Sequence, residues 1–318
     1  MTAQAPTWIH LERALTLALM HRLEVPGDIV RTFPNGKLAK FIRDHVAIIM
    51  ANWKRRWPGA EAAIIATALA TNNAAKSFAA GKSKFAGWIS PKVSKALQSL
   101  VAGAYGLSQG NVLKSFGVDT ETKKQPKGLI DAATPGPYKV IDRKAEKWLK
   151  KDNKFWVRDV WDEGLGDRIA SKTNSALQEG LGRKELAKRL KADLAQFAEP
   201  TSYWETVSSA SMTRARAFGA VSGFVEADAK SFKFVSVIDE RRTEICKHLH
   251  GRTWTIDVAV KQATSVMDAK TPDEMKAASP WLPEAEVLAM DDAELAAAGV
   301  TSPPLHGRCR STLVAVFD

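Results

Sequence analysis

The sequence predicts a mainly α-helical protein with a small antiparallel β element near its C-terminus, an α+β arrangement with an elongated helical N-terminal part. Apolar residues recur at helical spacing through most of the first 230 positions. Two late segments, 232–239 and 311–317, instead alternate apolar and polar positions over β-branched residues, which is typical of strands. Residues 119–137 are rich in proline, glycine and polar residues and indicate a connection between parts.

Four stretches of the first third are expected to be helical: 9–23, 37–57, 61–80 and 91–105. The second carries an apolar stripe and is expected to stop at Pro58, because proline breaks a helix interior. The third is rich in alanine, which has the highest helix propensity. The fourth begins with Pro91, and proline is favoured at the first position of a helix.

Three further stretches are expected to be helical beyond the connection: 140–161, 180–194 and 203–227. Leucines recur every four residues in the second, which predicts an amphipathic helix. The first carries four aromatic residues among its lysines: Trp148, Phe155, Trp156 and Trp161. Aromatic rings in a basic segment can stack on nucleic-acid bases, but this spacing favours a stripe facing the core.

The chain of 318 residues exceeds the usual length of a single domain, so we expect two domains, or one domain with a long helical extension. The predicted division is a helical region at 1–118, a linker or extended arm at 119–138, a second helical region at 139–230 and a small α+β domain at 231–318. In this last domain the two strands are expected to pair with each other. An acidic helical insertion, 284–295, lies between them in the sequence.

The composition is that of a globular protein, with 45% hydrophobic and 25% charged residues, and it excludes the disordered and fibrous classes. A net charge of +11 favours phosphate polymers or acidic protein surfaces as partners, although a well-solvated lysine-rich surface explains it equally. We name seven cations as candidate non-specific, salt-sensitive contacts to nucleic acid. They are Lys54, Arg55, Arg56, Lys82, Lys84, Lys123 and Lys124.

The N-terminal residues lack the basic leader and the small-residue cleavage site of a signal peptide. The most apolar internal stretch, 62–70, is far shorter than the roughly 20 residues of a membrane span. Two cysteines cannot form a disulfide framework, and their scarcity suits a reducing cytoplasm. We therefore expect a protein made in the cytoplasm, without membrane contact.

Pairing of the two strands would bring their flanks together, with Cys246 after the first strand and the segment 303–311 before the second. Cys246, His250, His306 and Cys309 then form a candidate Cys2His2 set, which suits one structural zinc ion. His248 is an alternative to His250. A disulfide or thiol pair between the two cysteines, and plain packing of these residues in the core, remain open.

Two other interpretations concern the same flanks. Asp239 stands at a strand end, and with Arg241 and Arg310 it is expected to form a structural latch of carboxylate and guanidinium groups. A catalytic pair, with Cys246 as nucleophile and His306 as base, can also be drawn. The sequence offers no oxyanion site and no orienting residue for it, so we assign no catalytic residue.

Four segments together resemble the C-terminal domain of the phage Mu F-like minor head proteins, also called phage head morphogenesis proteins. They are 203–224, 234–246, 249–254 and 303–311. The stretch 144–190 looks like the helical region found upstream in that family, so the resemblance covers about the last 180 residues. Arg242 stands where the family commonly has threonine, and Ser311 where some members carry another cysteine. Members with extra thiols have a fuller ligand set for zinc.

The resemblance implies a structural minor head protein of a tailed bacteriophage, a low-copy component of the virion that acts at or near the portal vertex. Head morphogenesis, DNA packaging or ejection would be its role, without enzymatic turnover. Its implied partners are the portal or major capsid protein and packaged double-stranded DNA, after assembly in the host cytoplasm. The alternatives are a zinc-dependent nucleic-acid-processing enzyme or toxin-like domain centred on Cys246 and His306, and a cytoplasmic DNA-binding protein unrelated to phages.

Overall fold

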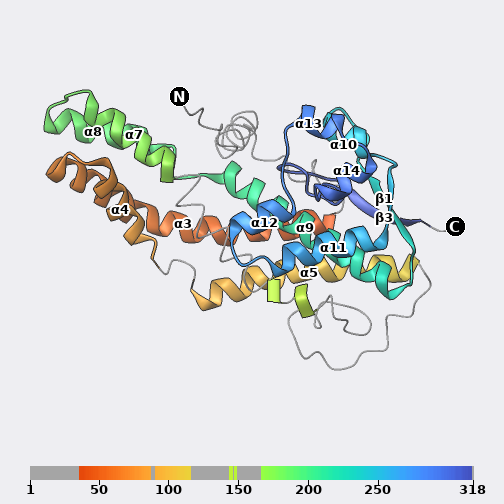
Figure 1. Cartoon of the computed structure of the whole chain (residues 1–318). Helices are drawn as coiled ribbons and strands as arrows, with labels where there is room; N and C mark the ends of the chain where they lie inside the picture. The colour runs from red at the N-terminus through yellow and green to blue at the C-terminus, as the bar shows by residue number, and fades with distance from the viewer. Residues whose placement is uncertain (1–35, 87–89, 116–142, 146, 149–165, 317–318) are drawn as a thin grey trace. The chain divides into compact units, whose positions relative to one another are not determined.

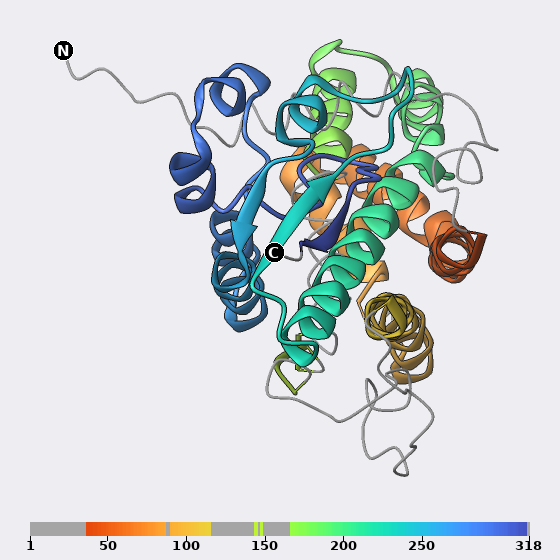
Figure 2. The same ribbon diagram turned by 90° about the vertical axis from the view of Figure 1, so that its right-hand side faces the viewer.

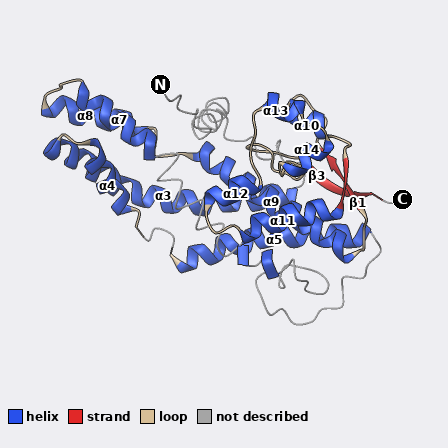
Figure 3. Ribbon diagram, in the orientation of Figure 1, coloured by secondary structure: helices blue, strands red, loops and turns tan. Residues whose placement is uncertain are grey.

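The computed structural model describes residues 36–86, 90–115, 143–145, 147–148 and 166–316. In this part the chain is helical apart from one three-stranded antiparallel sheet near its C-terminal end, which confirms the predicted fold class (Figures 1 and 3). The expected helix at 9–23 and the connection at 119–138 lie outside the described residues. No helix among the described residues is long and apolar enough to cross a membrane.

The chain divides into two compact units, each assembled from separate stretches of sequence. Among the described residues, the first unit comprises 36–44, 98–115, 143–145, 147–148 and 205–316, and the second comprises 45–86, 90–97 and 166–204. Within the part of the chain that the structure describes, the longer helices before the sheet are α3 (Gly36–Thr71), α4 (Ala74–Lys84), α5 (Pro91–Ser115), α7 (Gly166–Gln178), α8 (Arg183–Ala195) and α9 (Thr201–Glu226).

Helix α3 continues through Pro58, so the predicted stop at this residue is wrong. A proline inside a helix removes one main-chain hydrogen bond, at a cost of about 3 kcal/mol. Trp57, Ala60 and Ile64 flank it on the buried face of the helix, each no more than 3% exposed. Their burial and the alanine-rich sequence that follows offset the lost hydrogen bond.

The break in the alanine-rich stretch comes later, between α3 and α4. Asn72 takes a left-handed backbone conformation with φ of 49°, which asparagine tolerates better than most residues. Asn73 then caps α4, since its side chain accepts a hydrogen bond from the main-chain N–H of Lys76 at 2.9 Å. Two adjacent asparagines therefore divide the expected single helix 61–80 into two.

The second unit is a helical assembly in which α4 packs on α7, and α7 on α8. An apolar cluster joins Ala68, Ala176, Leu186 and Leu190, which confirms the amphipathic character predicted for 180–194. Trp53 is fully buried and donates a hydrogen bond from its indole nitrogen to the Phe197 carbonyl at 2.8 Å. This bond satisfies the one polar group of a large core side chain.

In the first unit, α9 packs closely against α5 because small residues line the contact. A Cβ atom added to Gly219 would lie 2.2 Å from the main-chain oxygen of Tyr105. Gln109 donates a hydrogen bond to Ser222 at 2.9 Å in the same buried contact. Trp148 is buried against Phe218, which confirms its expected place in the core, whereas Phe155, Trp156 and Trp161 lie outside the described residues.

Helix α9 leads into the sheet, whose strands are β1 (Ser231–Val235), β2 (Thr253–Thr255) and β3 (Thr312–Val316), in the order β2-β1-β3 (Figure 2). The predicted pairing of the two late strands is confirmed, since Phe232 lies opposite Ala315 and Phe234 opposite Leu313. Both phenylalanines are fully buried. Strand β2 was not predicted, because three residues are too few to show alternation.

Short helices occupy the connections between the strands. They are α10 (Glu244–Leu249), α11 (Ile256–Asp268), α12 (Pro272–Ala278), α13 (Glu284–Ala289) and α14 (Asp292–Ala297). The last two form the predicted acidic helical insertion. Asp291 and Glu294 make a reciprocal capping box at the start of α14, which fixes where that helix begins.

Two glycine-to-alanine substitutions should have opposite effects on stability, one in the contact of α9 with α5 and one at an open position of α3. Gly219→Ala should lower the free energy of unfolding by about 1–3 kcal/mol, because the new methyl group collides with the main chain of Tyr105. Gly59→Ala, inside α3 with nothing within 4 Å of the added carbon, should raise it by up to about 1 kcal/mol through better helix propensity. Denaturant titration of both variants measures this, and equal effects would contradict the close approach.

Candidate metal centre

The segment 303–311 precedes β3 and is held in place by side chains from other elements. Three of them donate hydrogen bonds to its main-chain carbonyls: Thr213 to Cys309 at 3.0 Å, Arg216 to Arg310 at 3.2 Å and Trp281 to Pro304 at 3.1 Å. Two of these donors lie on α9. An irregular segment without ladder partners thus satisfies its polar main-chain groups through neighbouring side chains.

A buried ion pair also ties this segment to α9. Arg308 donates to Glu205 at 2.8 Å, and both side chains are about nine-tenths buried. The preceding residue, Gly307, lies so close to α9 that an added Cβ atom would be 2.8 Å from a methyl group of Thr206. These contacts place the residues between 303 and 311 in one defined conformation against the helix.

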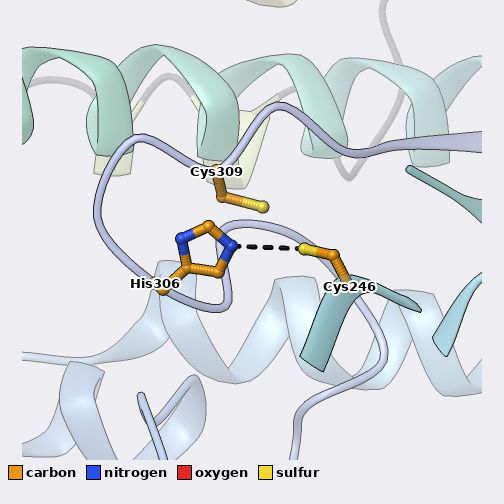
Figure 4. A group of neighbouring side chains, drawn as sticks. All are labelled: Cys246, His306 and Cys309. Atoms are coloured by element: carbon orange, nitrogen blue, oxygen red, sulfur yellow. Dashed lines mark hydrogen bonds between the residues drawn. The ribbon is translucent and has the colours of Figure 1, made fainter. Parts of the chain in front are cut away.

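Cys246, His306 and Cys309 converge within this framework (Figure 4). The first comes from α10 and the other two from the segment 303–311. Their two sulfur atoms and one ring nitrogen all lie within 4.8 Å of one another, and Cys246 Sγ is 3.2 Å from His306 Nε2. Both cysteines are buried as free thiols.

Hydrogen bonds orient each member of the group. His306 Nδ1 lies 2.8 Å from the Gly307 carbonyl, which can only accept, so Nδ1 carries a proton and Nε2 faces the sulfurs. Ser311 Oγ donates to Cys246 Sγ at 3.3 Å. Thr243 Oγ1 accepts from the main-chain N–H of Cys246 at 3.3 Å and lies 3.2 Å from His306 Nε2.

The two thiols are electrostatically unequal. A hydrogen bond from the Cys246 thiol outweighs burial and lowers the pKa of Cys309 well below its usual range. The same bond, followed by burial, raises the pKa of Cys246. Burial disfavours a charged ring at His306, but the Cys309 thiolate outweighs it and raises the pKa of the imidazole. The group therefore stabilises a thiolate on Cys309 without any carboxylate among its members.

The structure does not bring the fourth predicted ligand, His250, into this group. Its Nδ1 accepts a hydrogen bond from the main-chain N–H of Ser236 at 3.1 Å, so the ring is turned toward the end of β1. The alternative, His248, lies beside Arg252 and the carbonyl of Met290. Helix α10 ends at Leu249, so His250 follows the helix as its C-cap, whereas His248 lies within its last turn.

The predicted latch residues lie together beside the site. Both guanidinium nitrogens of Arg310 bind the Asp239 carboxylate, each at 2.5 Å. Arg241 contributes its main-chain N–H, which donates to Asp239 Oδ1 at 3.1 Å. The hydrogen bond from Arg310 holds the pKa of Asp239 below its ordinary value. This fork joins the end of β1 to the residue that follows Cys309.

Five of the seven predicted nucleic-acid contacts lie in the second unit, on α3 and at the end of α4: Lys54, Arg55, Arg56, Lys82 and Lys84. Arg56 donates to the Lys84 carbonyl at 3.2 Å, which brings the two groups together. Lys54 forms an exposed ion pair with Glu199. The remaining two, Lys123 and Lys124, lie outside the described residues.

Sequence reasoning missed the residues that support the site: Thr213, Arg216, Glu205, Thr243, Ser311 and Arg308. One signal was present, since Arg216 stands in a helix otherwise rich in small residues. An arginine among small residues can extend its guanidinium group past its neighbours to a hydrogen-bond acceptor on another segment. The hydroxyl groups of Thr243 and Ser311 left no such signal, because serine and threonine are common in turns.

Comparison with known proteins gives one match, to the family described as Phage Mu protein F like protein, over residues 167–314. This range begins in α7 and ends in β3, so it contains α9, β1, β2, the first part of β3 and the whole Cys-His-Cys group. The resemblance found in the sequence is thereby confirmed. Neither the curated proteins nor the solved structures contain a match to this chain.

The Asp239–Arg310 fork predicts a pH-dependent contribution to stability. Because the folded-state pKa of Asp239 is lowered, its contribution is present above the ordinary carboxyl pKa of about 3.9 and is lost as the pH falls through the lowered value. Asp239→Asn should cost at most about 1 kcal/mol at pH 7, since a third of the side chain is exposed and screened.

The difference between wild type and Asp239→Asn should shrink as unfolding is measured at successively lower pH below about 4. Glu240→Gln removes the neighbouring exposed carboxylate and serves as the control, with little expected effect. A difference that stays constant down to pH 2 would show that the carboxylate charge is not what Arg310 recognises.

Proposed function

From the match of residues 167–314 to the family of Phage Mu protein F-like proteins, we propose that the chain is a structural protein of the head of a tailed bacteriophage. More narrowly, it is a low-copy minor head protein that acts at or near the portal vertex during head morphogenesis, DNA packaging or ejection. The observation that carries this proposal is the family match, which spans every landmark named above.

The character of the Cys-His-Cys group supports a structural role over an enzymatic one. Cys246 and Cys309 are at most 4% exposed, so a substrate has little access to either sulfur. The hydrogen bond to Cys309, with burial, raises the pKa of Cys246, and a protonated thiol is a weak nucleophile. No carboxylate belongs to the group within the described residues, so the general base of a metal-dependent hydrolase is lacking there.

The partners that fit this role are the portal or major capsid protein and the packaged double-stranded DNA. A net charge of +11 favours contact with phosphate, and the five described cations of α3 and α4 offer one place for it. Binding there would follow the phosphate backbone and carry no sequence preference. The chain would then be part of the virion head after assembly in the host cytoplasm.

Head association is the first prediction of this proposal. In lysates of cells producing the phage that encodes it, the chain should co-sediment with assembled heads on a density gradient, at few copies per head. Loss of its gene should reduce the yield of DNA-filled heads. Free chain at the top of the gradient, with normal heads assembled without it, would contradict the role. Metal-dependent nuclease activity that His306→Ala abolishes would instead favour the enzymatic alternative.

The second prediction concerns contact with DNA. Lys82→Gln combined with Lys84→Gln should weaken binding to duplex DNA of random sequence. If each lysine contacts a phosphate, the slope of log affinity against log salt should decrease in magnitude by about 2. Lys188→Gln with Lys191→Gln, on exposed positions of α8, makes the same change in net charge and is the matched control. Equal losses in both pairs would attribute binding to overall charge.

A further inference from the structure

We propose that Cys246, His306 and Cys309 bind one zinc ion, with the fourth coordination position open to a small cavity beside the group. Such a site differs from the four-ligand set expected from the sequence, because His250 is engaged elsewhere. Zinc binding by these residues is independent of the chain's place in a phage head.

The three donor atoms have the chemistry and nearly the spacing that zinc requires. Thiolate sulfur and imidazole nitrogen are the ligands that zinc prefers in proteins. Bond lengths of about 2.0–2.3 Å place tetrahedral ligand atoms roughly 3.4–3.8 Å apart. Here the Cys246–His306 distance is 3.2 Å, and no pair in the group exceeds 4.8 Å. Shifts of about 1 Å in the donor atoms would bring them to the spacing of tetrahedral zinc ligands.

The hydrogen bonds around the group are those of a metal ligand sphere. A zinc-bound histidine usually donates its other ring N–H to a carbonyl or carboxylate, which fixes the tautomer and raises the basicity of the ligand nitrogen. His306 Nδ1 makes such a bond to the Gly307 carbonyl at 2.8 Å. Ser311 Oγ donates a hydrogen bond to Cys246 Sγ at 3.3 Å, a contact of the kind that orients a ligand sulfur.

The two other interpretations of the cysteines do not account for His306. A disulfide would satisfy both sulfurs and leave no task for an imidazole whose Nε2 is directed at them (Figure 4). Plain core packing accounts for the Nδ1 bond, which a buried imidazole N–H needs, but not for the convergence of three donor atoms within 4.8 Å. A single cation would be shared by all three of these donor atoms.

The loop that supplies two of the ligands is positioned before any ion binds. Thr213 and Arg216 hold the carbonyls of Cys309 and Arg310, and Glu205 holds Arg308. Because these anchors come from one helix, the entropy cost of assembling the site is met largely by folding. Metal affinity of such a site is expected to couple to the stability of the sheet.

The fourth position faces a cavity of about 30 Å³. Cys246 and His306 line it together with Ser236, Thr243, Ser311 and the four arginines at 241, 242, 308 and 310. This volume admits one water molecule or a small anion. Zinc sites with three protein ligands keep such an exchangeable position, and the arginines around this one favour an anion.

Metal analysis of the full-length chain, purified under reducing conditions, tests the ligand set. Wild type should carry about one zinc per chain. Cys309→Ser should lose at least about nine-tenths of it, whereas His250→Ala, the matched control, should keep it. Equal loss in both variants would overturn the three-ligand site in favour of the four-ligand one.

Cobalt substitution keeps the test decisive if Cys309→Ser fails to fold. Wild type loaded with Co²⁺ should show the visible bands of a tetrahedral site and the near-ultraviolet charge transfer of two thiolates. His306→Cys should retain the metal and increase the charge-transfer absorption in proportion to its third thiolate. Azide should shift the visible bands if the fourth position is exchangeable, and unchanged bands would overturn the open position.

Two results would overturn zinc binding altogether. Metal-free wild type with two titratable thiols, unable to take up Co²⁺, would assign the group to core packing. Wild type that binds no metal and releases two thiols only after reduction would assign it to a disulfide between Cys246 and Cys309.

Discussion

Antiparallel pairing of β1 with β3 is the interaction on which the rest of the C-terminal region depends. Cys246 and His306 are separated by 60 positions, and they meet because one follows β1 and the other precedes β3. Side chains alternate along a strand, so a slip of one residue would exchange the buried Phe232 and Phe234 for polar neighbours. The two phenylalanines thus fix the register, and the register fixes which flanking residues face one another.

Helix α9 converts this pairing into a defined site. The ladder ends at Thr312, and the residues before it have no strand partner for their main-chain groups. Thr213 and Arg216 supply the missing hydrogen bonds, and Arg216 does so from a buried position that lowers its pKa through desolvation. Burying a cation is unfavourable unless its N–H groups donate hydrogen bonds, and the main-chain carbonyls of this segment accept them. The helix that forms a close contact with α5 through Gly219 therefore also shapes the segment carrying Cys309.

Features that depend on a repeated pattern could be predicted from the sequence. Features that depend on the direction of a single side chain could not. Two-residue alternation located β1 and β3, and leucine spacing located α8, because each pattern is sampled several times. The stop predicted at Pro58 was wrong because helix propensity depends on the local sequence alone. It does not include the stabilisation from burying Trp57 and Ile64 on the core-facing side of the helix. His250 was expected among the ligands because pairing of the two strands would bring the segment after the first strand close to residues 303–311. Its actual direction follows from where α10 ends, which depends on tertiary contacts.

Joining Cys246 to Cys309 or His306 would close a loop of about 60 residues containing α11 to α14. Chain-entropy arguments give about 4 kcal/mol of stabilisation for a cross-link of that span, whether its chemistry is a disulfide or a metal bridge. Stability therefore does not distinguish the two, and neither does burial of the thiols. The proposed metal site differs from a disulfide in that it uses the imidazole as a third ligand. With Nδ1 bound to the Gly307 carbonyl and Nε2 directed at the sulfurs, His306 is the residue on which the proposed metal centre depends.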